Sequence, residues 1–158
     1  MCETHSVSLS WRGFGMLAFV ATFACGVFFG AAVYISLAQL PATMEVGGEF
    51  AGRFFGPMYR RAARVQAPLA IVGTVMAILS WLTGSRLAWL LGGLLLFAVM
   101  PLTYIWIMPI NTKLLDSSHP LIAADTEQLL RQWGRLHAIR TVLSGLAFVI
   151  FLAELTFA

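Results

Sequence analysis

The run from Gly13 to Leu40 contains no charged residue and most constrains how this chain folds. It exceeds the roughly 20 residues that carry a helix across a bilayer and is too long for the apolar core of a signal peptide. Three further apolar stretches follow. We therefore expect four membrane-spanning helices, at about residues 14–40, 67–83, 87–108 and 134–155.

Composition agrees with a membrane protein. Hydrophobic residues make up 59% of the 158 residues and charged residues 11%, against roughly 25% charged in soluble domains. These values predict an all-α membrane protein, a single four-helix transmembrane bundle over residues 1–158. No long basic run interleaved with aromatics occurs, which argues against a nucleic-acid partner. The two cysteines, Cys2 and Cys25, are too few for a disulfide framework.

The basic residues predict the orientation. Eight basic residues lie in the two large loops and the adjoining helix starts, whereas the opposite side has only Arg12 and Arg86. The eight are Arg53, Arg60, Arg61, Arg64, Lys113, Arg131, Arg135 and Arg140. By the positive-inside rule, both large loops are cytoplasmic and both termini lie outside. We expect an integral protein of a bacterial inner membrane.

The two cytoplasmic loops are expected to carry short interfacial helices. In the first, residues 45–66, aromatic residues alternate with arginines, a pattern typical of segments lying in the membrane interface. Gly56 and Pro57 should break it into two helices. The alternative is a basic loop that only fixes topology. The second loop covers residues 111–128.

Glycines and prolines mark two features within the spans. Gly26 and Gly30 have the spacing that lets helices approach closely, which favours ordinary packing and leaves a homo-oligomer through this face open. Pro101 should kink the third span and free the carbonyl of Phe97, and Pro109 should close it.

One helix face carries the main candidate site. Trp133, His137 and Arg140 are four and three residues apart, so they share a face where the fourth span begins. An imidazole and a guanidinium entering hydrocarbon must be paired, hydrated or turned towards a protein interior. Antiparallel spans bring further polar residues to the same rim: Glu45, Glu49, Arg64, Gln66, Tyr104 and Asn111.

Several kinds of site find no support. Haem held by two histidines needs two intramembrane imidazoles, and only His137 qualifies. A metal site from His137, His119 and Glu45 or Glu49 has no supporting spacing, so no cofactor is predicted, although a metal stays open. Nucleophile triads, phosphate loops and dinucleotide fingerprints are not recognisable. The halves show no repeat typical of secondary transporters.

Four segments together resemble the anthrone oxygenase-like family of small four-span membrane proteins, many of unknown function. They are Leu37–Glu45 (LAQLPATME), Tyr59–Ala70 (YRRAARVQAPLA), Met108–Asn111 with Leu114, and Trp133–Thr141 (WGRLHAIRT). The resemblance covers nearly the whole chain. It implies a four-helix bundle and, as in fungal members, oxidation of a polyketide anthrone to an anthraquinone by molecular oxygen.

The resemblance, together with residue chemistry, suggests roles for the rim. His137 would be the base that forms a carbanion, and Arg140 or Asn111 would stabilise the oxyanion, without flavin or metal. Trp133 would stack on a flat aromatic substrate partitioned into the bilayer. Gln66, Tyr104 and Glu45 complete the expected substrate site, at the cytoplasmic mouth.

Two other classes of function remain open. The chain would be a non-enzymatic membrane scaffold or subunit if the rim residues only anchor helices. It would be a quinone- or lipid-handling redox partner if the pocket holds such a molecule.

Overall fold

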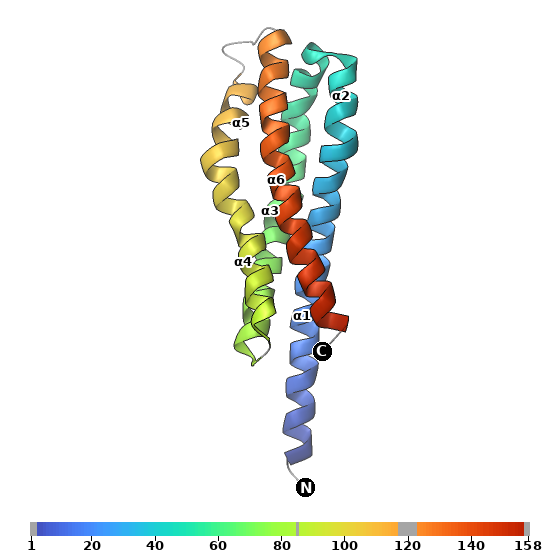
Figure 1. The fold of residues 1–158 in the computed structure, drawn as a ribbon, viewed down its shortest axis with the longest axis vertical. Helices are drawn as coiled ribbons and strands as arrows, with labels where there is room; N and C mark the ends of the chain where they lie inside the picture. Colours follow the sequence, from blue (N-terminus) through green and yellow to red (C-terminus); the bar gives the residue numbers. More distant parts are fainter. Residues whose placement is uncertain (1–2, 85, 117–122, 157–158) are drawn as a thin grey trace.

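Four helical rods make up the structure, a computed structural model that describes residues 3–84, 86–116 and 123–156. The first rod joins α1 (Glu3–Tyr34), η1 (Ile35–Gln39) and α2 (Leu40–Val46), and the second is α3 (Gly48–Leu82). The third joins α4 (Leu87–Leu102), η2 (Thr103–Ile107) and α5 (Met108–Leu115), and the fourth is α6 (Ala123–Thr156). Figure 1 shows the rods running alongside one another.

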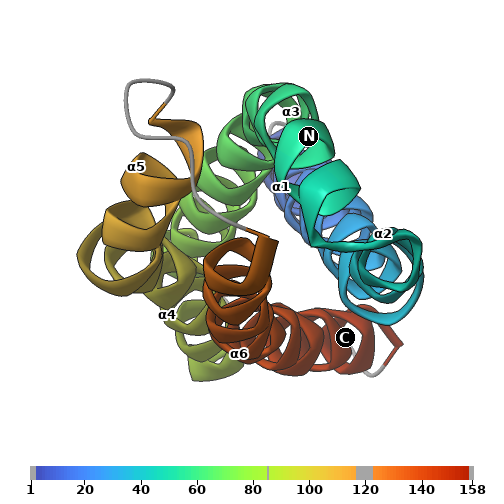
Figure 2. The ribbon, with the colours of Figure 1, turned by 90° about the horizontal axis from the view of Figure 1, so that it is seen from above.

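All four rods are candidate membrane spans. The apolar helices cover Gly15–Val46, Gly48–Leu82, Leu87–Leu115 and Ala124–Thr156. Viewed along the bundle, α1 packs between α3 and α6, and α4 packs between the same two helices on the other side (Figure 2). The expected all-helical fold with four candidate membrane spans is therefore present, and the rods are longer than the expected spans.

The first expected loop is helical. α3 runs without interruption through Gly56, Pro57 and Pro68, so the two short interfacial helices expected on either side of Gly56–Pro57 are not formed. A proline inside a helix removes one donor, and its effect is small where Pro57 is exposed and water or headgroups can reach the freed carbonyl. The reversal of direction occurs instead at Gly47, whose φ of 119° suits glycine. Residues 117–122 of the second expected loop lie outside the described residues.

Two π-helical turns interrupt the rods. η1 follows α1, and η2 begins two residues after Pro101, where the sequence predicted a kink. The third rod then continues through Pro109 to Leu115 rather than ending at Pro109. π-helical turns inside α-helices are frequent at functional sites, because they displace side chains from regular register.

Two apolar clusters fill the interior. One holds Phe28, Trp89, Leu96, Val99 and Phe151, with alanines that let the helices approach closely. The other, nearer α2 and α5, holds Ile35, Phe55, Ile107, Leu130 and Trp133. Buried polar side chains, among them Gln66, His137 and Arg140, lie where the two clusters meet.

Candidate functional site

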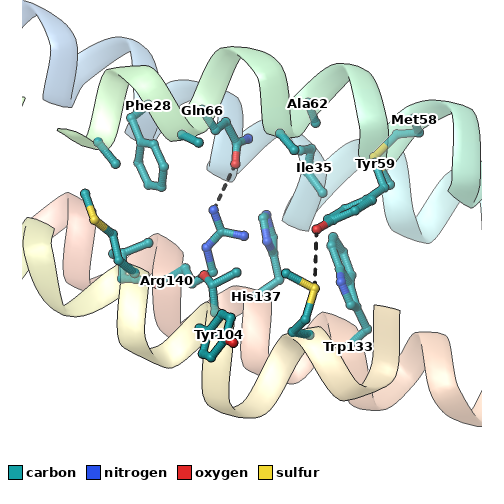
Figure 3. A pocket seen from close by; sticks show the side chains of 17 residues that line it. Phe28, Ile35, Met58, Tyr59, Ala62, Gln66, Tyr104, Trp133, His137 and Arg140 are labelled. Atoms are coloured by element: carbon teal, nitrogen blue, oxygen red, sulfur yellow. Dashed lines mark hydrogen bonds between the residues drawn. The ribbon is translucent and has the colours of Figure 1, made fainter. Parts of the chain in front are cut away.

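A pocket of about 260 Å³ lies between the rods at this junction. All four rods line it, and most of its walls are apolar. Its polar groups come mainly from Tyr59 and Gln66 on α3 and from His137 and Arg140 on α6 (Figure 3). A concave apolar site with a few convergent polar groups is the usual form of a small-molecule site, although this one is below the usual volume of about 300–1,000 Å³.

α6 contributes the three side chains expected to share one face. Trp133, His137 and Arg140 are all buried and line the pocket. The indole and imidazole rings are stacked, with centroids 4.6 Å apart and an angle of 10° between their planes. The predicted helix face is thus turned towards the protein interior instead of towards lipid headgroups.

Arg140 lies in this interior without a carboxylate partner among the described residues. Its Nη2 donates a hydrogen bond to Gln66 Oε1 at 3.1 Å, and its guanidinium carbon is 5.5 Å from the Phe28 ring centroid. Its Nε and the Gln66 Nε2 have no hydrogen-bond partner in the described part of the chain. Buried charges are usually paired, so this arrangement favours a ligand that presents an acceptor oxygen.

His137 is fully buried, and its ring nitrogens lack hydrogen-bond partners within the described structure. One side of its ring faces the backbone of Ala32 on α1, but neither nitrogen reaches hydrogen-bond geometry with any residue that the structure describes. A buried imidazole bordering a pocket can exchange a proton with whatever occupies the pocket.

The Trp133 indole is held in place by two neighbouring side chains. Its Nε1 donates a hydrogen bond to Asn111 Oδ1 at 2.9 Å. The Phe55 and Trp133 rings pack in a T-shaped arrangement, with their centroids 5.4 Å apart. Asn111 is buried but does not line the pocket. Asn111, predicted as a catalytic residue, therefore contacts the indole from outside the pocket lining.

Two further predicted residues lie away from the centre of the site. Tyr104 lines the pocket at its edge, with 75% of its surface exposed. Glu45 is exposed on α2 and does not line the pocket. The structure thus brings together Gln66, Trp133, His137 and Arg140, with Tyr104 at the margin and Glu45 outside.

The sequence analysis missed Tyr59 and Phe28. Tyr59 lines the pocket, and its hydroxyl donates to Met108 Sδ at 3.9 Å (Figure 3). Tyr59, Gln66 and Ala70 have the seven- and four-residue spacing of one helix face, but residues 45–66 were expected to form a loop. Phe28 gave no signal, because it is one aromatic residue in a wholly apolar run.

Metal binding was considered through His137, His119 and a glutamate. Among the side chains that the structure describes, no three from His, Cys, Asp or Glu lie close enough together to hold a metal ion. His119 itself lies outside the described residues.

Comparison with curated proteins and with solved structures gives no match. A family model described as anthrone oxygenase matches residues 55–150, more than half of the chain. The matched region includes every pocket residue from α3 and α6 named above. The chain therefore belongs to the anthrone oxygenase family.

Proposed function

We propose that this protein is a membrane oxygenase that oxidises a flat aromatic, polyketide-like substrate at a carbon next to its rings, with an anthrone as the simplest case. The observation that carries the proposal is the fully buried His137, stacked on Trp133 and next to Arg140 in an apolar pocket. Family membership supports the reaction class.

The first step is a proton transfer. The central methylene of an anthrone is acidic, because its conjugate base spreads charge into two rings and onto the carbonyl oxygen. One of the two ring nitrogens of His137, neither of which is hydrogen-bonded within the described structure, takes this proton. Arg140 and the Gln66 amide donate hydrogen bonds to the oxygen as it gains charge.

The second step consumes molecular oxygen. The carbanion gives an electron pair to O₂ in one-electron stages and forms a carbon–oxygen bond, and protonated His137 returns its proton to the resulting peroxide. Loss of the second methylene proton with cleavage of the O–O bond leaves a carbonyl and releases water. One oxygen atom ends in the quinone and the other in water, so the substrate supplies all four electrons. Neither flavin nor metal is required in this scheme.

Trp133 positions the substrate. Its indole is held by Asn111 and Phe55, stacks on the His137 ring and lines the pocket together with it. Contact of a planar ring system with this fixed pair of rings limits its orientation, which places the reacting carbon next to the base.

The orientation in the membrane is part of the proposal. Exposed basic residues gather near the α2 and α5 end of the bundle, including Arg60, Arg61, Arg64 and Arg135. By the positive-inside rule this end faces the cytoplasm, and both termini face outward. A reporter enzyme fused after Ala158 that works only outside the cytoplasm should be active; an inactive reporter with a folded protein would reverse the orientation.

Oxygen consumption tests the reaction. Purified protein in lipid nanodiscs, treated with chelator and free of flavin, should accelerate oxygen uptake with an anthrone, and His137→Ala should abolish the gain. Ser144→Ala is the matched control, because Ser144 is buried on the same helix but does not line the pocket. Equal oxygen uptake with and without wild-type protein would refute the proposal.

A quinone-handling redox partner is the second candidate. The hydrogen-bond donors in the pocket favour it. Arg140 and Gln66 present donors with no carboxylate partner in the described structure, and a quinone carbonyl would accept from both. A quinone that co-purifies with the protein, without anthrone-dependent oxygen uptake, would favour this candidate.

A further inference from the structure

The walls of the pocket differ in exposure. The residues of α1 and α6 that line it are all buried: Phe28, Trp133, His137 and Arg140. On the other side, Ala67 of α3 is exposed and Tyr104 of η2 is 75% exposed, yet both line the pocket. The pocket therefore reaches the surface between α3 and the α4–η2 segment.

The surface around this opening is apolar. Large outward-facing side chains lie within one turn of lining residues on both helices, each about half exposed: Ile71 on α3, Phe97 on α4 and Ile105 on η2. Ala67 and Tyr104 also lie within candidate membrane spans. An opening surrounded in this way faces hydrocarbon.

Local sequence explains why the opening lies here. On α3, Ala62, Ala63 and Ala67 line the pocket with minimal side chains, so they leave space between the helices. Opposite them, η2 begins just after Pro101, and its π-helical turn carries Thr103 and Tyr104 into the lining. Small side chains facing an irregular turn leave this side of the pocket open.

The depth of the opening is marked by charge. Arg64 is exposed three residues before Ala67, which at 1.5 Å per residue is about 4.5 Å along α3. An arginine facing the membrane boundary extends towards the headgroups. The opening thus lies just inside the hydrocarbon layer, where a flat aromatic molecule with one polar end accumulates.

We propose that the pocket opens sideways into the bilayer between α3 and η2, and that a flat apolar aromatic ligand enters there from the hydrocarbon layer rather than from water. Ala67 and Tyr104 border this lateral opening and control entry. The ligand class rests on the proposed function, whereas the route follows from exposure and surroundings.

Binding kinetics test the route. The probe is 9,10-anthraquinone, which binds without being oxidised, and capture by protein in nanodiscs is followed by quenching of tryptophan fluorescence. Ala67→Phe narrows the opening and should slow association at least tenfold with little change in affinity. Val65→Phe is the matched control, since Val65 is exposed two residues away and does not line the pocket; it should bind as the wild type does.

Two outcomes would overturn the proposal: wild-type association by a folded Ala67→Phe protein, or equally fast binding of water-soluble anthraquinone-2-sulfonate to the wild type. Because the probe is not a substrate, binding through the opening without oxygen uptake would refute only the proposed reaction. If the protein consumes oxygen with an anthrone while Ala67→Phe binds the probe at the wild-type rate, only the proposed route is refuted.

A spin label gives a second measurement that needs no change on α3. A label at Tyr104→Cys, with Cys2 and Cys25 replaced by serine, should collide with oxygen dissolved in the bilayer more often than with a water-soluble nickel complex. Added anthraquinone should reduce those collisions. A label at Thr112→Cys, exposed on α5 near the basic end, should show the opposite preference. Preferential collision of the label at 104 with nickel would contradict a lateral opening.

Discussion

Arg140 is the residue whose position needs most explanation. A charge in the interior of a membrane protein is costly unless it is paired or used, and its protein hydrogen bond is to the neutral Gln66 amide. Packing alone would be served as well by an apolar side chain of similar length. A role in binding an anionic or strongly polarised oxygen accounts for a guanidinium at this position.

Replacing Arg140 with methionine separates function from structure. Exchanging buried ionic groups for apolar ones of similar volume is often neutral or stabilising, so Arg140→Met should melt at the wild-type temperature or above. Loss of one donor to a developing oxyanion typically lowers the rate by about 10²–10³-fold, and anthrone-dependent oxygen uptake should fall by that amount.

Thermal unfolding in detergent and oxygen uptake, measured on the same preparation, check both parts. A markedly lower melting temperature with activity retained would assign Arg140 to structure and exclude it from the reaction. Arg140→Lys is the conservative control: it keeps the charge but loses the planar donor geometry, so it should recover only part of the rate.

At the scale of helices, the first rod carries the glycine pair singled out in the sequence. A Cβ on Gly26 would lie 2.7 Å from the Phe148 ring of α6, whereas a Cβ on Gly30 would meet nothing within 4 Å. Gly26 is therefore used in packing within the chain, and of the pair Gly30 alone has space for another molecule.

Alanine substitution distinguishes the two glycines. Gly26→Ala forces the Phe148 ring to move and should destabilise the protein by about 1–3 kcal/mol. Gly30→Ala should be neutral or stabilising by up to about 1 kcal/mol, because alanine favours a helix. Unfolding in detergent measures both effects. Dissociation of an oligomer by Gly30→Ala would instead place a copy of the chain against this position.

How far the sequence predicts the site depends on the element. On α6, the spacing of Trp133, His137 and Arg140 was sufficient to predict a shared face, because the single Gly134 did not interrupt the helix period. On α3, Gly56 and Pro57 suggested a break, and Tyr59 was lost with the expected loop. The helix continues because Pro57 is exposed, so water or headgroups can hydrogen-bond the carbonyl that it frees.

The π-helical turns could not be predicted at all. A turn with one extra residue forms where packing on both sides holds the flanking segments in register, and both η1 and η2 pack against α6. The difference in exposure between the walls of the pocket also depends on how the helices pack. Pro101 indicated an irregularity in the third span but not which side chains it would present.

At the scale of the whole molecule, the bundle places a polar layer between two apolar clusters and leaves a pocket there. In the proposed reaction, His137 removes a proton from a ligand in this pocket. That step precedes oxygen and can be observed without it.

Proton exchange under anaerobic conditions measures this step. In deuterated buffer, wild-type protein in nanodiscs should accelerate deuterium incorporation at the central carbon of an anthrone above the spontaneous rate. Ser144→Ala should do the same, and His137→Ala should not. Exchange at the spontaneous rate with wild-type protein that still consumes oxygen would contradict the account, because oxidation would then begin without His137 as the base.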